Sequence, residues 1–218
     1  MPESFDGPGG EDLTLARARA AEARDHLVRG AIDEAVRCIF EAVDFAPTDV
    51  RMMHEFVHSL QDHERYSDAL ALVERILAIE PENAAALIDL GYSLEPLGEL
   101  DRAWDAYTRA STLDPTDAVA LNNRAYLEMG RGNLTAALAD VTEALSRDDS
   151  ESIAYATRAE VLSQLGRIDE AFAALTRAIE LDASWVDTAK NSEFLQAVRE
   201  DPRWDRWLAE NEPSFGDA

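Results

Sequence analysis

The sequence predicts an all-α fold, an α-solenoid of five antiparallel helix pairs followed by a capping helix. Three observations support this prediction. The same residue types return every 34 residues over most of the 218-residue chain. Within each period, apolar residues recur three and four positions apart, which is the spacing of one face of an α-helix. Glycine and proline separate these apolar stretches at fixed places. A fixed period of this length is typical of repeat proteins, in which adjacent helix pairs stack and leave a concave and a convex face.

Three columns of the repeat fix its layout. A core column is occupied by alanine throughout: Ala35, Ala69, Ala103, Ala137 and Ala171. A turn column holds glycine except in the second repeat: Gly30, Glu64, Gly98, Gly132 and Gly166. A loop column begins with proline and then loses it: Pro47, Pro81, Pro115, Asp149 and Ala183. We expect the turn glycines to adopt a left-handed backbone after the first helix of each pair. We expect the prolines to end the second helix, because proline lacks an N–H donor.

The domain boundaries follow from this period. The repeats are predicted at residues 16–49, 50–83, 84–117, 118–151 and 152–185. A disordered acidic segment is predicted before them at 1–15, and a disordered tail at the end of the chain at 210–218. The first repeat is the weakest, because Arg19, Glu22 and His26 stand where apolar residues are expected. A terminal repeat exposes one of its sides, so polar residues there fit its position.

The period stops after the fifth repeat. An amphipathic stretch follows, then a break at Pro202, and then Trp204 and Trp207 at helical spacing. We predict that residues 186–209 form a C-terminal capping helix over the fifth repeat. The alternative is that the two tryptophans form an exposed docking patch, since aromatic residues are enriched in binding hot spots.

Composition restricts the partners and the compartment. The chain has 44 acidic and 20 basic residues, a formal net charge of −24. This balance argues against nucleic acids and anionic membranes as partners, because both attract basic faces. It serves solubility or, alternatively, attracts a basic protein. Cys38 is the single cysteine, which fits a reducing compartment. The first residues do not resemble a signal peptide, so a cytoplasmic location is expected.

These residues resemble the tetratricopeptide repeat family. The resemblance extends over residues 16–185 and is most specific in the third to fifth repeats, for example Ala103, Tyr107, Ala110 and Pro115 in the third. It implies an open right-handed superhelix whose first helices line the concave side. It also implies a non-enzymatic interaction module without a cofactor, which binds a peptide or helix of another protein in that groove.

One motif of a different kind lies in the second repeat. His54-Glu55-Phe56-Val57-His58 fits the H-E-x-x-H signature of zinc peptidases. The motif is in register with the first helix of the repeat, where Phe56 and Val57 fill core columns. A catalytic zinc needs a third protein ligand, and the chain has no residues outside the repeats to build a protease domain. We therefore predict no metal site and no enzyme, and the metal-dependent peptidase remains a remote alternative.

Helical phase predicts which side chains line the groove. The candidates for partner binding are Arg17, Arg24, Arg51, His54, His58, Tyr92, Asn122, Asn123 and Tyr126, and further inward positions include Asp89 and Glu160. The arginines and histidines would prefer an acidic end of a ligand. The tyrosines and asparagines would cover apolar groups and bond to a ligand's main chain. The alternative function is a self-associating assembly protein that uses the faces of its terminal repeat or cap.

Overall fold

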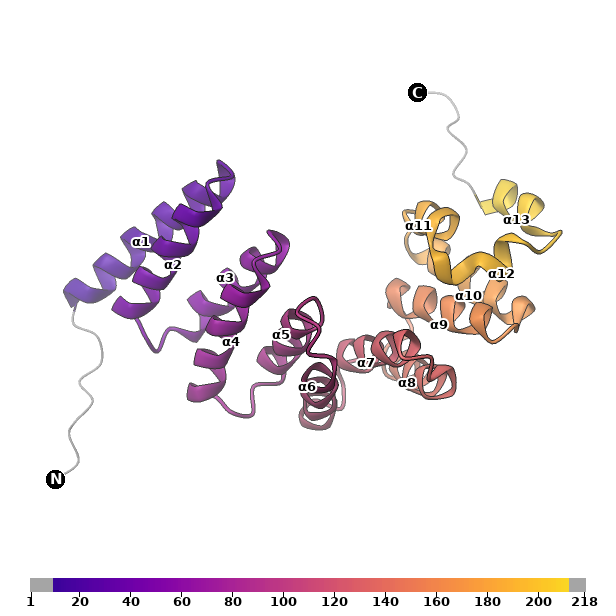
Figure 1. The fold of residues 1–218 in the computed structure, drawn as a ribbon, viewed down its shortest axis with the longest axis horizontal. Helices are drawn as coiled ribbons and strands as arrows, with labels where there is room; N and C mark the ends of the chain where they lie inside the picture. Colours follow the sequence, from indigo (N-terminus) through magenta and orange to yellow (C-terminus); the bar gives the residue numbers. More distant parts are fainter. Residues whose placement is uncertain (1–9, 212–218) are drawn as a thin grey trace. The chain divides into compact units, whose positions relative to one another are not determined.

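The computed structural model describes residues 10–211. These residues form α-helices and one short 3-10 helix, without β-strands (Figure 1). They divide between Ala106 and Tyr107 into two compact units, which we describe separately. The all-α prediction is confirmed.

The N-terminal unit consists of helix pairs. Its elements are α1 (Gly10–Val28), α2 (Ile32–Phe45), α3 (Val50–Asp62), α4 (Tyr66–Ile79), α5 (Ala84–Leu94) and the first half of α6 (Leu100–Leu113). Helix α1 packs along α2, and α3 packs along α4 (Figure 1). Helix α1 begins at Gly10, so residues 10–15 are helical where the sequence led us to expect disorder. Residues 1–9 lie outside the described part of the chain.

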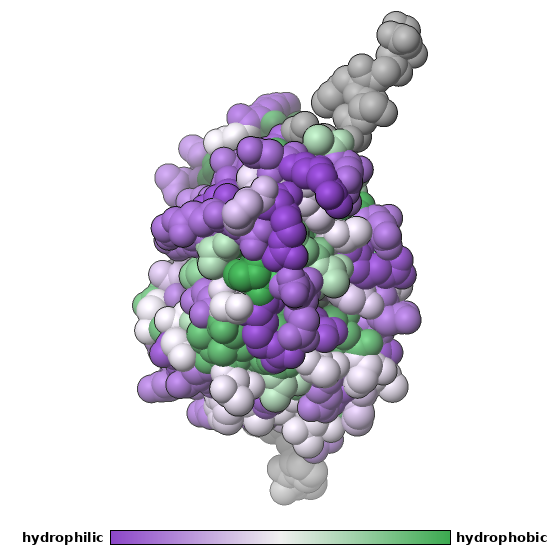
Figure 2. Space-filling model, turned by 90° about the vertical axis from the view of Figure 1, so that its right-hand side faces the viewer, coloured by the Kyte–Doolittle hydropathy of each residue, from purple (hydrophilic) through white to green (hydrophobic). Residues whose placement is uncertain are grey.

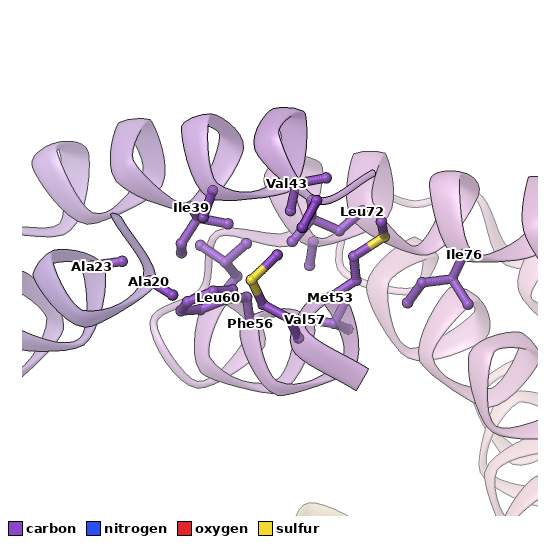
Figure 3. Packing of buried hydrophobic residues seen from close by; sticks show 14 of the residues in the cluster. Ala20, Ala23, Ile39, Val43, Met53, Phe56, Val57, Leu60, Leu72 and Ile76 are labelled. Carbon is purple, nitrogen blue, oxygen red and sulfur yellow. The ribbon is translucent and has the colours of Figure 1, made fainter. Parts of the chain in front are cut away.

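The core of this unit joins one helix pair to the next. Ala20 and Ala23 of α1 lie toward Ile39 of α2, while Phe56 and Leu60 of α3 fill the space beside them (Figure 3). Of these residues, Ala20 is 3% exposed and the other four are fully buried. The alanines let α1 approach its partner closely, and the larger side chains of α2 and α3 fill the core beside them.

The C-terminal unit repeats this arrangement and ends differently. It contains the rest of α6, then α7 (Val119–Gly130), α8 (Leu134–Arg147), α9 (Ser152–Gln164), α10 (Ile168–Leu181), α11 (Trp185–Asn191), η1 (Glu193–Leu195), α12 (Gln196–Arg199) and α13 (Trp204–Asn211). The predicted capping helix at 186–209 is therefore a series of short helices. A disordered tail was predicted at 210–218, but residues 210 and 211 belong to α13, and residues 212–218 lie outside the described residues.

The two tryptophans belong to the core of this cap. Trp204 and Trp207 are each 9% exposed, and their rings stack 5.2 Å apart. Trp207 also contacts Phe172 of α10 and donates from its Nε1 to Thr176 Oγ1 at 2.8 Å. Because both indoles are covered by their own unit, they do not form an exposed docking patch.

Every helix pair is joined by the same turn. After the first helix of each pair, the backbone closes with a Schellman pattern of two hydrogen bonds. In the second repeat, Glu64 N donates to Gln61 O at 2.9 Å and Arg65 N donates to Leu60 O at 2.8 Å. The four turn glycines have φ values of 72° to 78°, and Glu64 has φ 59°. The left-handed turn predicted from the sequence is present, even where the residue is not glycine.

The surface reflects the composition. The face shown in Figure 2 is largely hydrophilic, with smaller hydrophobic areas between the charged side chains. Among residues 10–211, none of the helices combines the length and the apolar character needed to cross a membrane.

Candidate functional site

A pocket of about 530 Å³ opens in the N-terminal unit between α1 and α3. Its lining comes from α1, from the loop after α2 and from α3: Leu13, Ala16, Arg17, Ala20, Arg24, Ala46, Asp49, Arg51, Met52 and Glu55. The pocket thus brings together the three arginines that the sequence predicted for the groove, with apolar side chains beside them. We refer to it as the arginine pocket.

The charges of the arginine pocket are only partly paired. Arg24 donates to both carboxylate oxygens of Glu55, at 2.5 and 2.8 Å, and this guanidinium lowers the pKa of the Glu55 carboxyl below its ordinary value. Asp49 accepts from the main-chain N–H of Met52 at 3.0 Å and caps α3. Arg17 and Arg51 are exposed, and neither forms an ion pair or hydrogen bond with another described residue. They remain available to a ligand.

On its other side, α3 meets α5 through a second cluster. His54 Nδ1 lies 3.1 Å from Asp89 Oδ2, and His58 Nε2 lies 3.2 Å from Asp89 Oδ1. Each residue offers one ligand atom, and the three atoms lie within 4.8 Å of one another. The Asp89 residue is 7% exposed, so two imidazoles take the place of water around its carboxylate. We call these three residues the His–Asp cluster.

The geometry of α3 disfavours the peptidase alternative. In an H-E-x-x-H peptidase, the glutamate acts as general base beside the metal. Here Glu55 turns toward α1 and is held by Arg24, whereas His54 and His58 turn toward Asp89 of α5. The carboxylate that would have to activate a water molecule is therefore bound elsewhere.

The tyrosine predicted for this unit is accessible. Tyr92 of α5 is 48% exposed and meets the ring of Tyr66 edge-on, with the ring centroids 6.4 Å apart. This contact fixes one edge of the ring and leaves the rest open to solvent.

In the C-terminal unit the predicted groove residues differ in their exposure to solvent. Tyr126 is 47% exposed and Asn123 is half-buried. Asn122 is only 5% exposed, and its Oδ1 is buried without a hydrogen-bond partner in the described structure. The Asn122 side chain is therefore not accessible to a ligand in the described structure.

The chain's own cap covers part of this face. The ring of Phe194 packs edge-on against Tyr126, with centroids 6.2 Å apart. Ser192 donates to Glu160 Oε1 of α9 at 2.6 Å. Burial raises the pKa of the Glu160 carboxyl, and the Ser192 hydrogen bond opposes that shift. Two inward positions of this unit are thus already in contact with residues 192–194.

The sequence did not identify the role of Asp89. It was expected only as one of several inward-facing residues, yet it is the centre of the His–Asp cluster. The sequence separation could have identified it, because residues that face each other on the first helices of adjacent repeats lie about one 34-residue period apart in the sequence. His54 and Asp89 are 35 residues apart, and Arg24 and Glu55 are 31 apart.

Comparisons with known proteins agree with this architecture. A family model described as tetratricopeptide repeat matches residues 54–118 and 122–185, more than half of the chain. No curated protein matches the sequence.

Solved structures share the fold at low sequence identity. The crystal structure of MamA is 21% identical, with a TM-score of 0.65, and the match covers 84% of this chain and 97% of that one. TTC0263, a tetratricopeptide repeat protein of Thermus thermophilus, is 18% identical with a TM-score of 0.63, covering 84% and 98%. YrrB, described as a tetratricopeptide repeat protein with an unusual peptide-binding site, is 18% identical with a TM-score of 0.55, covering 76% and 85%.

Proposed function

Because the chain belongs to the tetratricopeptide repeat family, we propose that it is a protein-interaction scaffold that binds an acidic peptide segment of a partner protein in the arginine pocket. Proteins of this family are generally non-enzymatic interaction modules. The finer assignment rests on one observation, which is that Arg17 and Arg51 line a pocket without being paired.

The chemistry of the pocket favours a carboxylate-bearing ligand. A guanidinium presents several N–H donors in a plane and binds carboxylates through two parallel hydrogen bonds. The rest of the chain is strongly acidic, with a net charge of −24, so an acidic ligand would be repelled from most other surfaces. Leu13 and Met52 add apolar contact area beside the arginines.

Further contacts would extend the site within the same unit. Tyr92 is exposed enough to cover an apolar side chain of the ligand. A precedent for peptide binding within this fold is YrrB, whose structure is described by its peptide-binding site. The single Cys38 is buried, and we propose a cytoplasmic location on the grounds of its lack of a disulfide partner.

The proposal is tested with an array of short synthetic peptides of graded charge, probed with the full chain. We expect retention of acidic peptides. The variant Arg17→Ala/Arg51→Ala should bind the best of them about tenfold more weakly, equivalent to about 1.4 kcal/mol. Binding should also weaken with added salt, since exposed charge pairs are screened.

A matched control separates local from global charge effects. Arg37 and Arg206 are exposed arginines outside the pocket, so Arg37→Ala/Arg206→Ala changes the net charge equally. Equal weakening by both double variants, or a preference for basic peptides, would contradict the assignment to the arginine pocket.

A further inference from the structure

We propose that the His–Asp cluster binds a divalent transition-metal ion, with His54, His58 and Asp89 as its protein ligands. The chemistry of two imidazoles and one carboxylate suits Zn²⁺ and its neighbours in the transition series. This site is separate from the arginine pocket and does not depend on the peptide-binding proposal.

The ligand atoms of the cluster lie close enough together to converge on one ion. Zinc lies about 2.0–2.1 Å from imidazole nitrogen and about 2.0–2.2 Å from carboxylate oxygen, so tetrahedral ligand atoms lie roughly 3.3 Å apart. His54 Nδ1 lies 3.1 Å from Asp89 Oδ2, and His58 Nε2 lies 3.2 Å from the other oxygen, Oδ1. With one ligand atom taken from each residue, the three atoms lie within 4.8 Å of one another, so a small rotation of the exposed His58 side chain brings them to the spacing that zinc requires. His54 and His58 are one helical turn apart on α3, which places both rings on the same face.

The polar contacts around Asp89 keep it in place. Gln61 of α3 donates from Nε2 to the main-chain oxygen of Asp89 at 3.1 Å and to Ser93 Oγ at 3.0 Å. These three residues are each less than a tenth exposed. The separation between α3 and α5 is therefore fixed by buried hydrogen bonds, and a preformed site loses less entropy on binding an ion.

The cluster also has an entry path. The His58 side chain is 64% exposed, while those of His54 and Asp89 are 20% and 10% exposed. An ion can therefore approach from the His58 side, and solvent can occupy its remaining coordination position. Three protein ligands with one open position describe an accessible site rather than a closed structural one.

One neighbour limits the affinity. His54 Nε2 lies 3.4 Å from Asn83 Nδ2, and Asn83 Oδ1 accepts from the main-chain N–H of Ala86 at 2.9 Å, capping α5. When Nδ1 of His54 binds a metal, the ring proton is on Nε2 and needs an acceptor. The Asn83 amide, which also donates to Glu80 Oε2 at 2.7 Å, presents a donor there. An aspartate at this position would still cap the helix and would supply the missing acceptor.

The experiment uses the full chain, treated with chelator and then titrated with zinc chloride in a calorimeter. We expect one zinc ion per chain. His58→Ala should reduce the affinity at least tenfold. It alters a mostly exposed side chain, so its fold, checked by circular dichroism, should be intact. Asp89→Asn should give a similar loss. Asn83→Asp should increase the affinity about tenfold, since such outer contacts typically change affinity 10- to 100-fold.

The matched control is His63→Ala. His63 directly follows α3, and its Nδ1 lies 2.8 Å from the main-chain oxygen of Ser59. It does not belong to the cluster, so its loss should leave zinc binding unchanged. The proposal is overturned if the wild-type chain binds no zinc, or if His58→Ala binds it as tightly as wild type does. The cluster would then be a set of hydrogen bonds that only joins α3 to α5.

Discussion

The turn after α3 gives the sharpest test of how the repeat stabilises the fold. Glu64 occupies the turn column with φ 59°, where the other four repeats have glycine. Its side chain is exposed and forms no ion pair or hydrogen bond with the rest of the described chain. Replacing Glu64 with glycine should therefore relieve backbone strain without removing a contact.

The size of the effect follows from two opposing contributions. A left-handed backbone is less favourable for an L-residue than for glycine by roughly 1–2 kcal/mol. Glycine gives the unfolded chain more conformational freedom, which offsets about 0.4–1 kcal/mol of that gain. We expect Glu64→Gly to raise the free energy of unfolding by about 1 kcal/mol. With a urea m-value of about 2 kcal/mol/M, the midpoint would rise by about 0.5 M.

The assay is urea unfolding followed by helical circular dichroism, and Gly98→Ala is the opposite control. Gly98 has φ 77°, and a Cβ added there would meet no atom within 4 Å. Its loss of stability, about 1 kcal/mol by the same two contributions, would come from the backbone alone. If Glu64→Gly lowers the midpoint while Gly98→Ala leaves it unchanged, the strain argument fails.

Three further changes test the core, a partly buried carboxyl and the cap. Phe56→Ala, at a fully buried position, should lower the free energy of unfolding by about 3–5 kcal/mol in urea unfolding. The pKa of Glu160 is higher in the folded chain than in the unfolded chain. The free energy of unfolding therefore falls as the pH rises from the unfolded-state pKa to the folded-state pKa. Glu160→Gln should therefore stabilise the chain at about pH 7, and the gain should vanish at about pH 4; an equal gain at both values would exclude this cause. Trp207→Phe, which removes the hydrogen bond to Thr176, should lower the free energy of unfolding by about 1 kcal/mol, and an unchanged urea midpoint would show that this bond contributes nothing.

The sequence predicts the helices well because apolar spacing and turn residues mark them locally, whatever the neighbouring helices are. The second helices of the pairs begin at regular intervals, at Ile32, Tyr66, Leu100, Leu134 and Ile168. The cap was less predictable: outside the repeat, only local signals remain. Pro202 marked a break correctly, but the division of residues 186–209 into short helices depends on packing against α9 and α10.

The candidate site was predicted only in part, because side-chain direction depends on the neighbouring helix. Helical phase brought Arg17, Arg24 and Arg51 together correctly. It could not show that Arg24 is paired with Glu55. It also could not show that the Asn122 side chain is buried.

The period of the backbone and the period of side-chain contacts are different properties of this chain. On α7, Arg124 donates to Asp140 of α8 at 2.8 and 2.7 Å. One repeat later the equivalent positions are Arg158 and Ala174, and the Nε atom of Arg158 is buried without a partner in the described structure. The turn hydrogen bonds persist through all five repeats because they use main-chain atoms. Side-chain pairs need two matching residues, so substitution at one position removes them.

This difference allows one helix to carry two unrelated sites. Helix α3 keeps Phe56 and Leu60 in the core, as the repeat requires. The residues on its outer positions are not repeated from one helix pair to the next. Arg51 and neighbouring residues face α1 in the arginine pocket, while His54 and His58 face Asp89 of α5. The core columns thus determine the spacing between the helices, and that fixed spacing brings the side chains of adjacent repeats within bonding distance. A binding site in such a chain is therefore best sought between residues about one period apart, rather than within a single repeat.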